Sequence, residues 1–485
     1  MSTELLLNVA SGEKRVAVVE DGLLQEIYIE RSAGRGIVGN IYRGKVIRVL
    51  PGMQVAFVDI GTKKSAFLSA DDVTFYKKHA TSDTRSLEKI SELLYEGQSI
   101  IVQVLKSPVG NKGARLTTNI VLLSRHLIFM PRSSGIFVSR RVADENERRR
   151  LKDIVRHSHD NIGRFIIRAA AEELDRRSLS RNVAFLENLW SKILEHSQSK
   201  NNKTLLHSEL EVTQRLLRDL ISTSLTSVLV DSKPYLDALK AFSSEYAPEL
   251  TEKLWLHEEE EPIFDTPIEN EIQRSLGRRV MLKSGGYLVI DQTEAVNVID
   301  VNTGAFVGSS KNVQETILST NIEASLSIAR QIRLRNLGGI IIIDFINMKS
   351  DRHRRNVLRS LENSLRKDRA KIRLNGFTRL GLVEMTRART YESTDRILHS
   401  TCPTCGGRGR LKTVESVCRD IFRELALIKN KDTDLVLVHA SLDVSKTLRT
   451  DESHALSDLA ISIGKHIQIQ AEKLYTREQF DIIVA

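Results

Sequence analysis

The chain has 485 residues and should contain several domains, since a single hydrophobic core rarely grows beyond about 250 to 300 residues. A hydrophobic content of 41% is enough to fold them, and the lack of any apolar run of about 18 residues predicts no membrane-spanning segment. The net charge of +10 favours a polyanion as partner.

Residues 1–36 alternate as short strands. Two runs, 16–19 and 27–29, flank the turn-like sequence Glu20-Asp21-Gly22. Because a pair of strands this small is not stable alone, we expect it to pair with a later part of the chain.

Short strands separated by glycines follow in residues 37–118, a pattern typical of a small β-barrel. Along one of these strands Ala56, Val58 and Ile60 share a face and form the expected core. The alternation then turns Phe57 outward.

An outward aromatic suits base stacking on single-stranded nucleic acid. Phe57 and Phe67 are the candidate aromatics, and Lys106 and Lys112 lie nearby in the sequence. A single aromatic side chain is more often part of a core, so both interpretations stay open for these two.

Residues 119 to about 215 are mixed in character, and residues 207–280 have a mostly helical pattern. In the first of these ranges we expect strands at 127–130 and 165–168 and charged helices at 145–156 and 179–196. There are no repeats or proline-rich linkers, so the parts should pack closely.

Two apolar runs in residues 281–399 each end on an aspartate, Asp300 and Asp344, with a helix-length segment between them. Two strands joined by one helix prefer to lie parallel, so their carboxyl ends point the same way. Two carboxylates at neighbouring strand ends repel unless a cation lies between them, and oxygen ligands favour Mg²⁺ or Mn²⁺. Asn302 follows Asp300 on the same side of the chain. Alternatively, each aspartate only caps the segment that follows it.

Two helices should cover this sheet. The first carries one apolar stripe, formed by Leu318, Ile322, Leu326, Ala329 and Ile332. The second directs Val357, Leu358, Leu361 and Leu365 inward, and Arg355, Arg359 and Arg366 outward. Ligands of such α/β units collect at the carboxyl ends of the strands.

The positive charge is concentrated around the second aspartate. Residues 330–389 contain 16 Lys and Arg against five Asp and Glu, a net charge of +11. A phosphate backbone would need such charge near a cleavage site. A solvated helix face is the simpler interpretation for any one helix, but it explains less well why the bias persists over the whole range.

The sequence Cys402-Pro403-Thr404-Cys405-Gly406-Gly407 resembles half of a zinc knuckle. A structural zinc needs four ligands. The others could be His399 and Cys418, or a second chain could donate its own pair, which would make zinc a dimer link. A thioredoxin-type redox pair is a third interpretation, although no matching βαβ pattern surrounds the motif.

The chain has three cysteines, too few for a disulfide framework, which indicates a reducing compartment. The N-terminus lacks a basic region followed by a long apolar stretch. We therefore expect a cytoplasmic protein.

Taken together, the motifs resemble those of the ribonuclease E/G family over nearly the whole chain. The matching runs, in order, are 298–305 around Asp300, 321–324 (Asn-Ile-Glu-Ala), 333–339 (Arg-Leu-Arg-Asn-Leu-Gly-Gly), 342–346 around Asp344, and 402–409. The resemblance implies a single-strand-specific endoribonuclease that leaves 5′-phosphate and 3′-hydroxyl ends, acts in rRNA 5′-end maturation and mRNA decay, and is stimulated by a substrate 5′-monophosphate.

The resemblance also implies a multidomain α/β (α+β) architecture. Its expected units are an RNase H-like subdomain in two parts (1–36 and 215–280), an inserted S1 (OB-type) barrel (37–118), a 5′-sensor (119–214), a DNase I-like catalytic subdomain (281–399), a zinc link (400–415) and a small C-terminal domain (416–485).

Site roles carry over by position. Asp300 and Asp344 match magnesium ligands, and Asn302 matches the residue that helps to orient the site. Phe57, Phe67 and Lys112 match RNA contacts of the S1 barrel, with Lys106 beside them. Cys402 and Cys405 match a zinc link shared between protomers of a homodimer, which could pair further into a tetramer.

The 5′-phosphate site departs from the family pattern. Arg168 matches the arginine that binds the phosphate, but Ala169 stands where a threonine hydroxyl is expected. A hydrogen bond to a charged group is worth roughly 1.5 to 3 kcal/mol, so sensing should be weaker here. Lys371 would support the site with the single charge of its ammonium group, whereas an arginine there could donate two parallel hydrogen bonds. The rival hypothesis for the whole chain is a non-catalytic S1-type RNA-binding scaffold.

Overall fold

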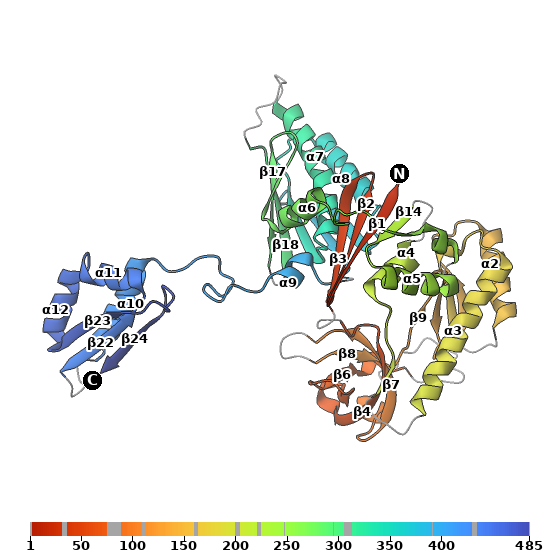
Figure 1. Ribbon diagram of the computed structural model, residues 1–485, viewed down its shortest axis with the longest axis horizontal. Coiled ribbons are helices and arrows are strands. Elements are labelled where there is room, and N and C mark those ends of the chain that lie inside the picture. The colour runs from red at the N-terminus through yellow and green to blue at the C-terminus, as the bar shows by residue number, and fades with distance from the viewer. Residues whose placement is uncertain are drawn as a thin grey trace. The chain divides into compact units, whose positions relative to one another are not determined.

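The computed structural model describes residues 2–31, 36–74, 89–108, 113–159, 163–198, 204–220, 225–246, 248–293, 295–304, 313–389, 391–428 and 434–484. The chain divides into two compact units, Met1–Ile397 and Leu398–Ala485 (Figure 1). In the described part of the chain, no helix has both the length and the apolar character needed to cross a membrane.

A five-stranded sheet in the order β15-β14-β1-β2-β3 joins the N-terminal strands to a later segment. Its strands are β1 (Thr3–Ala10), β2 (Glu13–Glu20), β3 (Leu23–Arg31), β14 (Leu225–Val230) and β15 (Leu254–Leu256). β1 runs parallel to β14, and apolar side chains of α4 (Val212–Leu220) and α5 (Lys233–Tyr246) pack on both. The expected long-range pairing is confirmed.

The mostly helical prediction for 207–280 was incomplete. It holds for α4, α5 and α6 (Thr266–Leu276), but it missed β14 and β15. Both strands are short apolar runs, and periodicity alone does not separate such runs from buried helix segments.

A closed β-barrel is formed by β4 (Ile41–Leu50), β5 (Val55–Asp59), β6 (Ala66–Ser69), β8 (Arg115–Thr117) and β7 (Ser99–Lys106), because β7 pairs back onto β4. Ala56, Val58 and Ile60 are buried in its core, as predicted, together with Ile90 of α1 (Ile90–Leu93). β13 (Thr204–His207) extends the sheet beside β4. A closed barrel of five strands is consistent with an S1 or OB-type domain.

The next part of the chain forms a four-stranded sheet, ordered β11-β12-β10-β9, with two helices. The elements are β9 (Leu122–Leu123), β10 (Leu127–Met130), β11 (Gly135–Val138), α2 (Glu145–Ser158), β12 (Arg164–Ile167) and α3 (Arg176–Ser197). Asp144 and Asp175 cap the two helices by accepting backbone N–H groups of Asn146 and Ser178. The helices and strands predicted here are confirmed.

A six-stranded sheet in the order β16-β17-β18-β19-β21-β20 carries both aspartates. Its strands are β16 (Arg279–Met281), β17 (Tyr287–Gln292), β18 (Val296–Asn302), β19 (Gly339–Asp344), β20 (Ile372–Phe377) and β21 (Val383–Arg387). The helices α7 (Val313–Leu334) and α8 (Asp351–Leu365) lie against one face of this sheet (Figure 1). Their apolar side chains share a core with that face. We call the other face, which includes Val298 (37% exposed) and Ile340 (47% exposed), the open face.

The predicted stripe of α7 is wrong at one position. Leu326 is 54% exposed, and the buried face instead includes Ala324 and Ile328. The orientation predicted for α8 is confirmed: Val357, Leu361 and Leu365 are buried. A single apolar residue off the stripe is normal at a protein surface.

The second unit contains the cysteine pair and a small domain. A three-stranded sheet in the order β23-β22-β24 is formed by β22 (Leu435–Ala440), β23 (His466–Ala471) and β24 (Phe480–Val484). Its core is shared with α10 (Val414–Ala426), α11 (Leu442–Arg449) and α12 (Ser453–Ile463).

Candidate active site

The two aspartates lie side by side. β18 and β19 run parallel, and their register places Asp300 opposite Asp344. The buried neighbours Ile299 and Ile343 point into the core with α7 and α8, so both carboxylates lie on the open face. Burial and the charge of Asp300 raise the pKa of Asp344. The predicted meeting of the two strand ends is confirmed.

The amide of Asn302 completes this group. Its Nδ2 donates a hydrogen bond of 2.8 Å to Oδ2 of Asp300, which fixes that carboxylate and leaves the amide oxygen as an acceptor. Two neighbouring carboxylates repel each other, and a bound cation removes that repulsion. Oxygen ligands of this kind suit Mg²⁺, which keeps several waters when one or two carboxylates hold it. The residues therefore fit a magnesium ion.

The site is not a closed protein cage. Among the described residues, no group of three or more His, Cys, Asp or Glu side chains could enclose a metal ion. Such an open site leaves room for substrate and water.

Polar residues of α7 hold the loops around the aspartates, and the sequence reasoning gave them no role. Oε1 of Glu323 accepts the backbone N–H of Lys283 at 2.6 Å and that of Ser284 at 3.3 Å. The buried amide of Asn321 donates to the carbonyl of Ile346 and accepts its N–H. The signal was present in the sequence, because Asn321 and Glu323 are polar residues within an apolar helix pattern.

Two glycines allow the turn between β16 and β17 to pack tightly against the end of β18. A Cβ atom at Gly286 would lie 2.7 Å from the carbonyl oxygen of Asn302. Gly304 has a φ of +59°, and a Cβ there would lie 2.5 Å from the oxygen of Gly285. The backbone that carries Asn302 is therefore fixed from both sides.

On the barrel, the two candidate aromatics are cross-strand partners. Phe57 of β5 lies opposite Phe67 of β6, and both are half-buried, whereas the alternating residues of each strand are buried. The register continues from Phe67 to Arg115 and from Arg115 to Lys106. Lys112 lies outside the described residues.

The candidate 5′-phosphate residues come from two sheets. Arg168 follows β12, and its Nη1 donates to the carbonyl of Ser124 at 3.1 Å. Ala169 begins the short 3₁₀ turn η4 (Ala169–Ala171) and is half-buried. Lys371 precedes β20 and is exposed. The roles of all three remain predictions.

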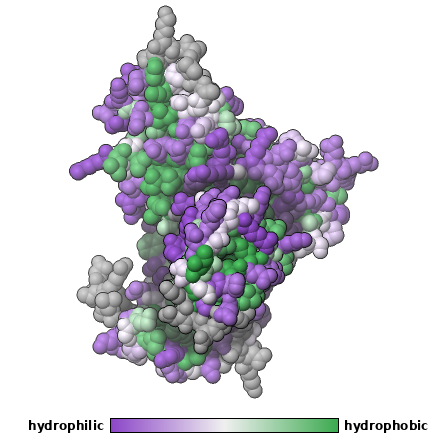
Figure 2. All heavy atoms as spheres, turned by 90° about the vertical axis from the view of Figure 1, so that its left-hand side faces the viewer, coloured by the Kyte–Doolittle hydropathy of each residue, from purple (hydrophilic) through white to green (hydrophobic). Residues whose placement is uncertain are grey.

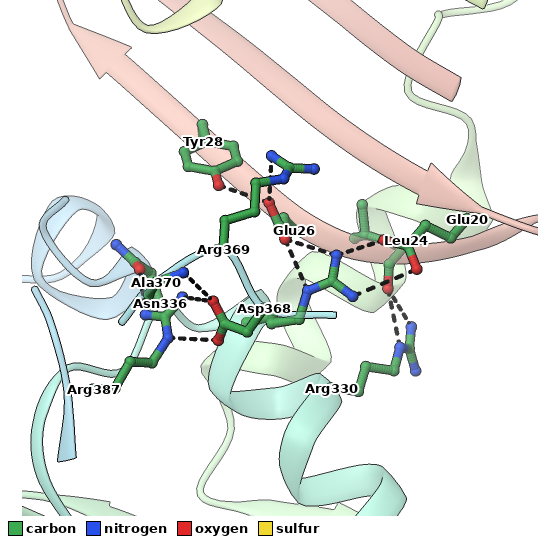
Figure 3. A network of polar contacts seen from close by, with 11 residues as sticks. Glu20, Leu24, Glu26, Tyr28, Arg330, Asn336, Asp368, Arg369, Ala370 and Arg387 are labelled. Carbon is green, nitrogen blue, oxygen red and sulfur yellow. Dashed lines mark hydrogen bonds and ion pairs between the residues drawn. The ribbon is translucent and has the colours of Figure 1, made fainter. Parts of the chain in front are cut away.

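Part of the basic segment 330–389 is used inside the protein, which corrects the prediction that it faces a phosphate backbone throughout. Arg333 is 5% exposed and pairs with Glu20 at 2.5 Å and with Glu26 at 2.7 Å. Arg369 pairs with Glu26 at 3.6 Å, and Arg330 donates to the carbonyl of Leu24 (Figure 3). These contacts join β2 and β3 to α7 and to the segment before β20.

A second buried pair lies beside this network (Figure 3). Arg387 is 6% exposed, pairs with Asp368 at 2.7 Å and donates to Oδ1 of Asn336. Arg335 is also buried, and burial lowers its pKa to about 10. Apart from Arg369, which pairs with Glu26, the basic residues that remain exposed around the second aspartate are Lys349, Arg352, Arg355, Arg359, Arg366, Lys367, Lys371, Arg373, Arg379 and Arg389.

The cysteine pair has the local features of a metal knuckle. Backbone hydrogen bonds from Cys405 and Thr404 lower the pKa of the Cys402 thiol. Gly406 and Gly407 have φ of +55° and +81°, which lets the chain turn after the pair. Cys418 lies in the core of the small domain, and burial raises its pKa to about 11. Its burial makes this thiol less accessible to a metal ion than Cys402 and Cys405 are.

Comparison with known proteins identifies the class. The sequence model described as "Ribonuclease E/G family" matches residues 121–390. The chain belongs to the ribonuclease E/G family.

Individual relatives refine this result. The chain is 52% identical, over its whole length and theirs, to ribonuclease G of Salmonella typhimurium and of Escherichia coli K12. It is 35% identical to ribonuclease E of Haemophilus influenzae, with 94% of this chain and 49% of that protein covered.

Proposed function

We propose that the chain is a magnesium-dependent endoribonuclease that cuts single-stranded RNA and leaves 5′-phosphate and 3′-hydroxyl ends. The endoribonuclease class follows from its family and from the full-length identity to ribonuclease G. The proposal includes stimulation by a substrate 5′-monophosphate, a role in rRNA 5′-end maturation and mRNA decay, and a cytoplasmic location. The free state of all three cysteines supports a reducing compartment.

The proposed chemistry uses the open face of the catalytic sheet. Asp300 and Asp344 would hold Mg²⁺, which when bound lowers the pKa of a coordinated water and neutralises charge on the scissile phosphate. Asn302 keeps the Asp300 carboxylate in one orientation. Its amide oxygen can accept a hydrogen bond from the attacking water, and the second N–H of its amide can donate to a phosphate oxygen. The water oxygen bonds to phosphorus while the bond to the 3′ oxygen breaks, and that oxygen gains a proton.

Substrate binding would be distributed over the other parts of the first unit. Phe57 and Phe67 would stack unpaired bases, with Lys106 and Lys112 contacting the backbone. Arg168 would bind a 5′-monophosphate with Lys371 in support. The ten exposed basic residues named above would follow the phosphate backbone.

We also propose the expected subdomain roles. The first sheet takes strands from both 1–36 and 215–280, which supports one RNase H-like subdomain built from two segments. The sheets of residues 119–214 and 281–399 would be the 5′-sensor and the DNase I-like subdomain. Cys402 and Cys405 would share Zn²⁺ with the same pair of a second protomer, giving a homodimer that could pair into a tetramer.

The register of Asp300 opposite Asp344 is the observation that carries the catalytic proposal. The test is Asp300→Asn, which keeps the shape of the side chain but removes one of the two charges. We expect cleavage of a labelled single-stranded RNA in Mg²⁺ to fall by at least 10³-fold (about 4 kcal/mol), with binding of the same RNA nearly unchanged. Wild-type turnover in this variant would favour the non-catalytic scaffold instead.

A further inference from the structure

A free cation lies on the open face beside the two aspartates. The register across the sheet runs from Arg279 of β16 to Val289, from Val289 to Asp300, and from Asp300 to Asp344. Cross-strand partners point to the same face, so Arg279 shares the open face with the carboxylates. Two strand spacings, about 9.6 Å, separate its Cα from that of Asp300.

The side chain of Arg279 is held in place by an aromatic ring. Its guanidinium carbon lies 4.2 Å from the centre of the Tyr287 ring, and Tyr287 is the cross-strand partner of Asn302. Stacking on a ring restrains the long arginine side chain, while the N–H groups at the edge of the guanidinium remain available for hydrogen bonds. The pair therefore adjoins both Asn302 and Asp300.

The neighbouring Arg278 has a carboxylate partner, and Arg279 differs from it in this respect. Arg278 pairs with Asp291 through two hydrogen bonds of 2.5 and 2.7 Å, so its charge is neutralised within the protein. Arg279 is exposed and has no carboxylate partner in the described ranges. An unneutralised guanidinium on the same face as the two carboxylates would attract an anion that the carboxylates alone repel.

The surroundings suit a nucleotide rather than a small ion. Figure 2, turned so that the side of β17 and β18 faces the viewer, shows hydrophobic side chains in its upper part with hydrophilic ones around them. Met281, Val298 and Ile340 are the exposed apolar side chains of this sheet. Apolar surface next to a cation matches a chain of bases and phosphates.

We propose that Arg279, supported by Tyr287, binds the RNA phosphate next to the scissile one and so positions the substrate on the open face. This inference rests on the proposed endoribonuclease function and adds a subsite to it. Arg279 would contact the substrate directly, while Tyr287 would be a positioning residue that acts through the arginine.

The test compares matched variants on one labelled single-stranded RNA. Arg279→Ala should lower kcat/KM by about tenfold or more, the loss expected for a charge-assisted hydrogen bond. Arg279→Lys should lower kcat/KM less than Arg279→Ala does, because lysine keeps the positive charge but not the planar group that can donate two hydrogen bonds. Tyr287→Leu should lower kcat/KM by about as much as Arg279→Lys. Arg278→Ala is the control and should change kcat/KM less than twofold. Thermal melts check that all variants fold.

A neutral methylphosphonate in the substrate identifies the contact. Placed at the linkage next to the cleavage site, it should slow the wild-type enzyme about tenfold and should not slow Arg279→Ala further. An equal methylphosphonate effect in both proteins, or equal activity of Arg279→Ala and Arg278→Ala, would overturn the subsite alone, provided that cleavage still requires Asp300. If the wild type does not cut RNA, the proposed function and the subsite both fail.

Discussion

At the scale of single residues, the site depends on a few atoms that the backbone holds in place. Asp300 and Asp344 are adjacent because of strand register, and Asn302 is fixed by a packed turn. The proposed sensor has Ala169 where the resemblance to the family led us to expect a threonine hydroxyl. Its strength is therefore a property that one substitution should change.

We predict that Ala169→Thr increases the preference for a 5′-monophosphate. The new hydroxyl can donate to a phosphate oxygen, and one such bond is worth roughly 1.5 to 3 kcal/mol, or about tenfold or more. The measurement is the ratio of kcat/KM for one RNA with a 5′-monophosphate and with a 5′-hydroxyl. Ala169→Val, which has the same shape without the hydroxyl, should leave the ratio unchanged; equal ratios in both variants would refute the prediction.

At the scale of elements, the barrel presents one row of outward side chains. Arg48 of β4 lies opposite Phe57, and the row continues through Phe67 to Arg115. Arg115 is already paired with Asp72 at 2.7 Å, so the aromatics and the other cations would supply the binding. Base stacking, rather than charge alone, should then dominate affinity at this surface.

We predict that Phe57→Ala and Phe67→Ala each weaken RNA binding by about 5-fold to 100-fold, because stacking contributes roughly 1–3 kcal/mol per base. Fluorescence anisotropy with a short single-stranded RNA measures the effect. Tyr95→Ala removes another exposed aromatic of the same region and should have no effect. Equal losses for all three would show a general change in the barrel.

A second element-scale feature is the buried network between β3 and α7. Burial raises the pKa of Glu26, but the charges of Arg369 and Arg333 and hydrogen bonds from Tyr28 and Arg333 outweigh it, so the pKa is lowered overall. A carboxylate whose pKa is lower in the folded state stabilises the protein above its unfolded pKa, near 4.5. This contribution is lost as the pH falls through the folded pKa.

We predict that Glu26→Gln lowers the free energy of unfolding by about 3 kcal/mol at pH 7, since it removes a buried carboxylate and leaves the buried Arg333 with Glu20 as its one remaining charge partner. The difference from the wild type should shrink below about pH 4.5, as the wild-type carboxylate also becomes neutral. Denaturant titrations at several pH values measure this. Glu13→Gln, which affects the exposed pair with Arg31, should cost less than 1 kcal/mol at any pH. A loss that does not depend on pH would contradict the electrostatic origin.

At the scale of the whole molecule, the chain consists of two units, and the cysteine pair lies in the second. A single chain supplies two suitable thiolates there, while Cys418 is enclosed in the core. In the proposed link, a tetrahedral zinc would take its other two ligands from a second protomer.

We predict that removing zinc dissociates the protein into monomers. A chelator, or Cys402→Ser with Cys405→Ser, should reduce the mass in analytical ultracentrifugation to that of a single chain and should remove the bound zinc. Cys418→Ala should keep the oligomer and the bound zinc, because that side chain does not belong to the proposed link. If zinc loss stopped cleavage while the oligomer stayed intact, the link would be a catalytic site instead.

Much of the local structure could be predicted from the sequence. Alternation identified the barrel core at Ala56 and Val58, and apolar runs located the strands that end on Asp300 and Asp344. Long-range features were harder. The sequence did not predict β14, because a short apolar run does not show which strand it will pair with. It predicted Leu326 to be buried, because periodicity shows the centre of the apolar face of a helix but not how far that face extends.

The sequence by itself determined which residue types stand at strand ends, in the C-x-x-C turn and along each helix face, because these depend on neighbours a few positions apart. Only the tertiary structure decided that Arg333 and Arg387 are buried in ion pairs while Arg279 stays exposed beside Asp300. The reason is physical: the same positive charge binds a carboxylate or a phosphate, and strand register and packing between distant segments decide which one it meets.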